Sequence, residues 1–139
     1  MCGVLAYRWD GRRSEVVFQT TPGSYNDQKV VRFLRDLRRA FPRRRVILIW
    51  DRLGAHRSGY MQAYLAGQRR WLETTHLPAY SPELNPVEPL WAHLKGGELA
   101  NRTEGNLNIM ARIARRSIRR IRKKPRLAQG FLRRTGLSF

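Results

Sequence analysis

The chain has 139 residues, which fits one domain of ordinary size with a single core. Its longest strongly apolar run, Val46 to Trp50, is far shorter than the ~20 residues that span a bilayer. The first four residues lack signal-peptide organisation, so we expect a soluble, cytoplasmic protein with no membrane partner. The single cysteine, Cys2, excludes an internal disulfide and a multi-cysteine zinc site.

Basic residues dominate the composition, with 28 Lys and Arg against 10 Asp and Glu and a formal net charge of +18. Such a surplus repels itself unless a polyanion screens it, and the usual polyanion is nucleic acid. Charge alone does not separate an enzyme from a ribosomal-type basic protein, because phosphate contacts give affinity without specifying chemistry.

The amino-terminal segment predicts a β-hairpin. Residues 3–9 and 14–20 read as strands, and Asp10-Gly11 between them readily takes the positive φ angles of a turn. Asp10 is therefore explained by the turn rather than by a functional role.

A helix and a strand follow the hairpin. Asn26 or Asp27 can cap a helix whose apolar residues recur at helical spacing from Val30 to Phe41. The next apolar run, Val46–Trp50, predicts a strand buried on both faces, and Asp51 lies at its carboxyl end.

Ser58 can cap a short helix, and residues 71–77 predict another strand, so the order to this point is ββαβαβ. Three prolines then stiffen the segment 78–86, which fixes the path of the chain towards Glu88. A further helix with an apolar stripe begins at about Val87.

The carboxyl-terminal segment carries no acid after Glu104 and many arginines. Apolar residues at helical spacing from Leu107 to Ile121 predict a basic helix docked on the rest of the chain, up to Pro125. We therefore divide the chain into a main domain, residues 1–105, and a basic helical tail, residues 106–139.

Two carboxylates stand out against this basic background. Asp51 ends a strand and Glu88 opens a later helix, so both can meet at a sheet rim and hold a divalent metal for phosphodiester chemistry. Each also has a simpler structural role. Asp51 can cap the loop after its strand, and Asn85 to Glu88 reads as a capping box in which Glu88 satisfies backbone donors.

A longer set of motifs carries a resemblance to a known family. These motifs are Trp50-Asp51, His56-Arg57-Ser58, the string from Leu77 to Glu88, Trp91, Leu94-Lys95 and Glu98 to Asn101. Over about residues 3–101 the chain resembles the catalytic domain of mariner-like DDE transposases, in the bacterial insertion-sequence branch of the DDE superfamily endonucleases.

The resemblance implies an RNase H-like mixed sheet flanked by helices and a metal-dependent activity. That activity is DNA strand cleavage and strand transfer, with two Mg²⁺ or Mn²⁺ ions held by an Asp-Asp-Glu triad. By position, Asp51 corresponds to the second catalytic, metal-binding carboxylate and Glu88 to the third.

The chain departs from the family in three ways. The strand that carries the first aspartate, central in the family's sheet, would lie upstream of Met1, and so would the helix-turn-helix module. Without that strand the sheet has open edges that invite pairing with another chain. Arg52 also stands where the family more commonly has asparagine.

The expected partners are transposon ends and target DNA, the product of an upstream reading frame carrying the missing parts, and a second copy of the chain. We expect a nucleoid-associated location. The candidate DNA-binding residues are His56, Arg57, Lys95, Arg112, Arg116 and Arg119. The alternative function is that of a non-catalytic DNA-binding relic or regulator.

Overall fold

The computed structural model describes residues 2–10, 13–21, 23–96 and 107–136. The chain forms two compact units. We call Met1–Pro22 together with Glu83–Phe139 the hairpin unit, and Gly23–Pro82 the strand-pair unit. The domain boundary expected between residues 105 and 106 lies outside the described residues and stays a prediction.

The hairpin unit is built on the predicted β-hairpin, which is confirmed. Strand β1, Cys2–Tyr7, pairs antiparallel with β2, Ser14–Gln19, in a register that joins Cys2 to Gln19 and Tyr7 to Ser14. The Arg8 backbone N–H donates to the Arg13 carbonyl at 2.9 Å and closes the hairpin beyond the last strand pair.

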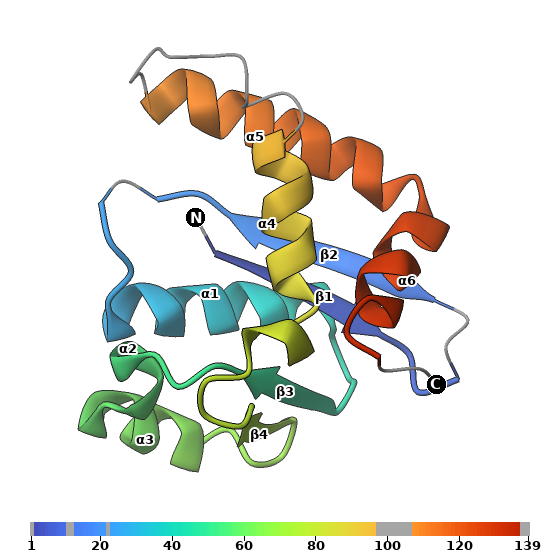
Figure 1. The fold of residues 1–139 in the computed structure, drawn as a ribbon. Helices are drawn as coiled ribbons and strands as arrows, with labels where there is room; N and C mark the ends of the chain where they lie inside the picture. Colours follow the sequence, from blue (N-terminus) through green and yellow to red (C-terminus); the bar gives the residue numbers. More distant parts are fainter. Residues whose placement is uncertain (1, 11–12, 22, 97–106, 137–139) are drawn as a thin grey trace. The chain divides into compact units, whose positions relative to one another are not determined.

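In its described residues the hairpin unit also contains three α-helices: α4, Val87–Gly96; α5, Leu107–Arg122; and α6, Pro125–Arg133. A short 3-10 turn, Pro82–Leu84, precedes α4. Figure 1 shows α4, α5 and α6 against the hairpin. One core joins strands and helices; its buried members are Leu5, Val16, Leu90, Leu94, Ile118, Ile121, Ala128 and Phe131. The prediction that the basic segment docks as a helix is therefore confirmed.

Close packing of α4 on the hairpin depends on Gly3. A Cβ added at this position would lie only 3.0 Å from the Cη2 atom of Trp91, so no larger residue fits without a shift of the indole. Trp91 also packs on Phe18, with ring centroids 5.9 Å apart. The interpretation of Trp91 as a core residue is confirmed.

Two arginines of α5 donate hydrogen bonds to β2 and to the residue that follows it. The Arg122 Nε donates to the Val16 carbonyl at 2.8 Å, and an Arg115 guanidinium nitrogen donates to the Thr20 hydroxyl at 2.6 Å. These charge-assisted hydrogen bonds fix the position of α5 along the strand.

The strand-pair unit begins with helix α1, Asp27–Ala40. The Asn26 side chain, one of the two predicted caps, accepts from the Lys29 backbone N–H at 3.0 Å. Its apolar face is buried and consists of Val30, Val31, Phe33, Leu34 and Leu37.

Strands β3, Val46–Trp50, and β4, Leu72–His76, form a parallel pair in which Trp50 stands opposite His76. Helices α2, Gly54–Arg57, and α3, Gly59–Ala66, connect them. Because the strands are parallel, both end at the same rim, and Asp51 follows β3 there.

The prediction that β3 is buried on both faces is wrong. Leu48 and Trp50 are buried, whereas Ile47 and Ile49 are 68% and 58% exposed. Successive side chains of a strand point to opposite faces, and no described element of the strand-pair unit covers the isoleucine face. A continuous apolar run is thus compatible with a half-covered strand.

Each sheet has two strands among the described residues. One edge of β1 and one edge of β3 therefore have no strand partner in that part of the chain. In the same residues, no helix is both long and apolar enough to cross a membrane.

Candidate active site

The Asp51 carboxylate is exposed and anchored through one of its two oxygens. Its Oδ1 accepts from the Leu53 backbone N–H at 3.0 Å and lies 2.9 Å from the Nδ1 atom of His56. The Oδ2 atom takes part in no hydrogen bond or ion pair among the described residues. The carboxylate, which is 56% exposed, therefore keeps one oxygen for an outside ligand.

Three aromatic rings lie beside Asp51. The His56 imidazole stacks on the Trp50 indole, with ring centroids 4.3 Å apart and planes 7° from parallel. His76 lies on Trp50 at a centroid distance of 6.0 Å. The indole Nε1 of Trp50 and the Nε2 of His76 are buried without a hydrogen-bond partner in the described part of the chain. Burial lowers the pKa of His76, and the neighbouring Arg52 lowers it further.

Arg52, the departure from the family pattern, has a defined structural contact. Its Nε donates to the Leu77 carbonyl at 3.2 Å. Leu77 directly follows β4, and its own backbone N–H donates to the Trp50 carbonyl at 2.8 Å. The ends of β3 and β4 are therefore joined both by a backbone hydrogen bond and by the hydrogen bond from the Arg52 side chain.

Glu88 lies in the first turn of α4 with an exposed side chain. The start of the helix is held by Asn85, whose Oδ1 accepts from the Val87 N–H at 3.1 Å and whose carbonyl accepts from the Glu88 N–H at 3.0 Å. Within the described residues the Glu88 carboxylate makes no return hydrogen bond, so the capping box is only half formed. In the described residues the start of α4 is therefore capped by Asn85 without the Glu88 carboxylate.

The two predicted carboxylates come from different units: Asp51 from the strand-pair unit and Glu88 from the hairpin unit. The described residues contain no group of three or more His, Cys, Asp or Glu that could hold a metal ion. Their roles as catalytic and metal-binding residues stay predictions.

The predicted DNA-binding residues are mostly exposed. Arg57 ends α2, Lys95 is in the last turn of α4, and both side chains are exposed. His56 differs, because its side chain is only 14% exposed and contacts Asp51. Its assignment to DNA stays untested.

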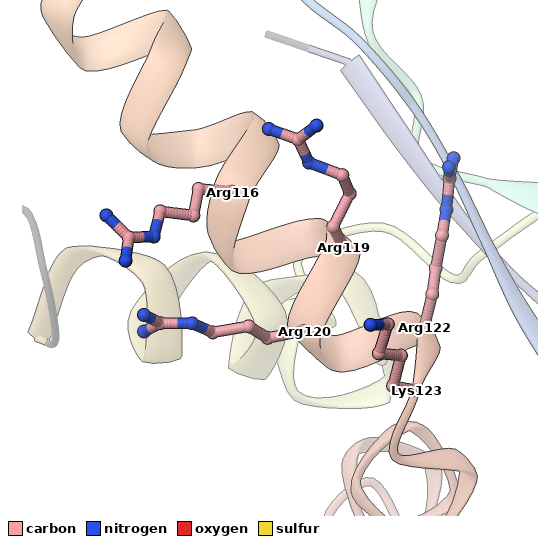
Figure 2. A pocket seen from close by; sticks show the side chains of 5 residues that line it. All are labelled: Arg116, Arg119, Arg120, Arg122 and Lys123. Carbon is pink, nitrogen blue, oxygen red and sulfur yellow. The ribbon is translucent and has the colours of Figure 1, made fainter.

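The outward side of α5 carries a stripe of exposed cations. Arg112, Arg116 and Arg119 on the helix, and Lys123 directly after its last residue, recur at three- and four-residue spacing, opposite the buried Ala114, Ile118 and Ile121. We call these four residues the α5 stripe. The last turns of the helix also form an open hollow, lined by Arg116, Arg119, Arg120, Arg122 and Lys123 (Figure 2). Arg120 and Lys123 were not among the predicted residues, although the four-residue spacing from Arg116 and Arg119 could have identified both.

The exposed Asp51 carboxylate after β3 and, separately, the exposed cations along α5 are each compatible with an enzyme that acts on nucleic acid. The family model of the DDE superfamily endonucleases matches residues 9–121, and the chain belongs to this family. The predicted family resemblance is thereby confirmed, and the alternative of a non-catalytic relic or regulator is not favoured.

A solved structure supports the fold assignment. The chain is similar to the catalytic domain of Mos1 mariner transposase, with a TM-score of 0.54 and 19% sequence identity. The match covers 91% of this chain and 69% of that chain. The predicted RNase H-like fold class is therefore confirmed. No curated protein matches the chain.

Proposed function

We propose that this chain provides Asp51 and Glu88 as the second and third carboxylates of a metal-dependent site that cleaves and joins DNA strands during transposition. The proposal rests on the way the Asp51 carboxylate is held, in a residue range that matches the DDE endonuclease family model. The residue follows β3 at the strand rim, with one oxygen anchored and the other left for a ligand.

The donor chemistry fits Mg²⁺ or Mn²⁺, which prefer carboxylate oxygens. Neither Asp51 nor Glu88 pairs with a lysine or arginine in the described residues, so their oxygens are not neutralised by the basic surface. Two such ions, when bound, would activate the attacking water or 3′-hydroxyl and stabilise the leaving oxygen. Asp51 and Glu88 would hold them.

The basic surface would bind the DNA backbone. The α5 stripe spans about 16 Å at 1.5 Å per residue, the length of about five nucleotide steps along one DNA strand. Its cations would neutralise phosphates, while Arg57 and Lys95 would add contacts from α2 and α4. Binding to transposon ends and to target DNA would hold the protein at the nucleoid.

Two carboxylates are fewer than the three of the family's triad. We propose that the product of an upstream reading frame supplies the first aspartate on a strand, together with a helix-turn-helix module. The open strand edges of β1 and β3 support this proposal, because an unpaired edge can accept a strand from another chain. The alternative is that a second copy of this chain pairs with these edges.

The decisive experiment measures nicking of end-labelled DNA that carries the ends of the element encoding this chain. The chain is assayed with Mg²⁺ or Mn²⁺, alone and with the upstream product. We expect nicking in the mixture, and a loss of at least about 100-fold in Asp51→Asn and Glu88→Gln.

Glu83→Gln is the matched control, because Glu83 is an exposed acid in the segment that leads into α4. It should retain nicking. Activity that survives both Asp51→Asn and Glu88→Gln, or no activity in any mixture, would reject the catalytic proposal. Sedimentation of the chain alone and of the mixture distinguishes the upstream product from a second copy.

A further inference from the structure

We propose that His56 is a positioning residue that holds the Asp51 carboxylate in one orientation, with Oδ1 occupied and Oδ2 directed to a metal ion. The consequence for metal binding rests on the proposed function. The hydrogen bond itself does not, and it is tested separately.

The contact between the two side chains is short. The His56 Nδ1 lies 2.9 Å from Asp51 Oδ1 and 3.2 Å from the Asp51 carbonyl oxygen. Both atoms are acceptors, so Nδ1 must carry the proton, in the neutral Nδ1–H tautomer or in the imidazolium. Because the Leu53 N–H donates to the same Oδ1 at 3.0 Å, two donors hold one oxygen.

Two contacts hold His56 in place, one on its ring and one on its backbone. It stacks nearly parallel on Trp50, which is 8% exposed and buried at the end of β3. The His56 backbone N–H donates to the Leu53 carbonyl at 2.8 Å, which fixes the turn that carries the ring. Because the stacking and the turn fix the orientation and the position of the ring, its Nδ1 is directed at Asp51 Oδ1.

An exposed aspartate without such a donor would rotate among several side-chain orientations. Arg52 directly follows Asp51, and Arg57 directly follows His56. A carboxylate that is free to rotate could therefore turn towards either guanidinium group instead of towards a metal ion. Fixing one oxygen reduces the conformational entropy lost on binding a ligand. Partners of this kind typically change metal affinity by ~10-fold to 100-fold when removed.

The first test observes the hydrogen bond without metal. Nitrogen-15 NMR of the full chain should show His56 with a protonated Nδ1 whose proton exchanges slowly, and Asp51→Ala should abolish that slow exchange. His93, whose ring packs on Phe131, serves as the internal reference. A neutral His56 protonated only at Nε2 would overturn the proposal.

The second test measures binding of Mn²⁺ alone, from the paramagnetic broadening of signals around Asp51. His56→Phe keeps a ring on Trp50 but removes the donor, and we expect binding about 10-fold weaker. His56→Asn places an amide N–H near the position of Nδ1 and should lose less than about 3-fold. Equal affinity in the wild type and His56→Phe would overturn the proposal, as would equal losses in both variants.

The two tests separate this inference from the proposed function. If Mn²⁺ causes no broadening that depends on Asp51 in the wild type, the metal role of Asp51 fails. In that case the NMR measurement of which His56 ring nitrogen carries the proton still tests whether His56 positions Asp51. His93→Phe, made in parallel, shows what the loss of an unrelated imidazole does to Mn²⁺ binding.

Discussion

His76 is a histidine whose environment opposes its charged form. It ends β4 opposite Trp50, its Nε2 is buried without a partner in the described residues, and burial lowers its pKa below the usual value. Protonation of His76 in the folded state therefore costs more than protonation in the unfolded chain.

This difference predicts how stability depends on pH. At a pH between the lowered folded pKa and the unfolded value of about 6.5, the unfolded chain binds more protons, so folding stability decreases as pH falls through that window. Denaturant unfolding at several pH values should show this decrease in the wild type. The decrease should be smaller in His76→Gln. An identical pH dependence in the two proteins would contradict the prediction.

Tyr7 links the hairpin to the last helix. Its hydroxyl donates to the Ala128 carbonyl at 2.8 Å, and burial raises the pKa of the phenol, so the donor proton is retained at all ordinary pH values. We expect Tyr7→Phe to lower the free energy of unfolding by about 1 kcal/mol, measured by denaturant titration.

Tyr80→Phe is the matched control for that measurement. The Tyr80 side chain is fully exposed, so the same chemical change should leave the free energy of unfolding within about 0.5 kcal/mol of the wild type. Equal effects at both positions would mean that the Tyr7 hydrogen bond does not stabilise the fold.

At the residue scale, the sequence motifs indicated Asp51 and Glu88 but not their surroundings. The contact between His56 and Asp51 depends on how the turn after β3 is closed, through the Leu53 backbone and the Trp50 ring. Such contacts arise from tertiary geometry, and hydrophobic periodicity carries no information about them.

At the scale of elements, the α5 stripe makes a quantitative prediction for DNA binding. Replacing Arg112, Arg116, Arg119 and Lys123 by Gln should weaken binding and lower the slope of log affinity against log salt by about 3 to 4, since each phosphate contact contributes ~0.9. Fluorescence anisotropy with duplex DNA at several salt concentrations measures this slope.

The control removes the same charge from the strand-pair unit. Its four replaced residues are the exposed Arg32, Arg44, Arg69 and Arg70. A slope lowered equally by both variants would show that net charge alone governs binding and that the stripe has no special role.

Most elements could be predicted, because apolar periodicity and capping residues agreed in them. Helix α1 has both its apolar stripe and the Asn26 cap, and in the sequence Asp10-Gly11 between two apolar runs indicated the hairpin. Within the tail predicted as helical, α6 was not predicted as a separate helix, although Pro125 at its start and the spacing of Ala128, Phe131 and Leu132 are helical signals. The burial of β3 was mispredicted because a run of apolar residues does not reveal which faces other elements cover.

At the scale of the whole molecule, the open edge of β3 predicts stabilisation by a partner that supplies a strand. The upstream product at 100 times its dissociation constant should stabilise the chain by about 2.7 kcal/mol, seen as a raised Tm. Ile47→Lys combined with Ile49→Lys should reduce the effect, because lysine side chains on an edge strand oppose its pairing with another strand. An unchanged Tm in the presence of the upstream product would contradict strand donation.

The arginines of α5 differ in how much change they should tolerate over evolution. Arg122 and Arg115 form directed hydrogen bonds to β2 and to Thr20 just after it. A lysine ammonium on a flexible stem does not reproduce these bonds in the same geometry. The DNA contact proposed for the α5 stripe needs only positive charge near phosphate, so lysine and arginine should be able to replace one another there. Exchange between lysine and arginine should therefore be frequent along the stripe and rare at positions 115 and 122. Comparing the sequences of this chain's descendants would test this difference.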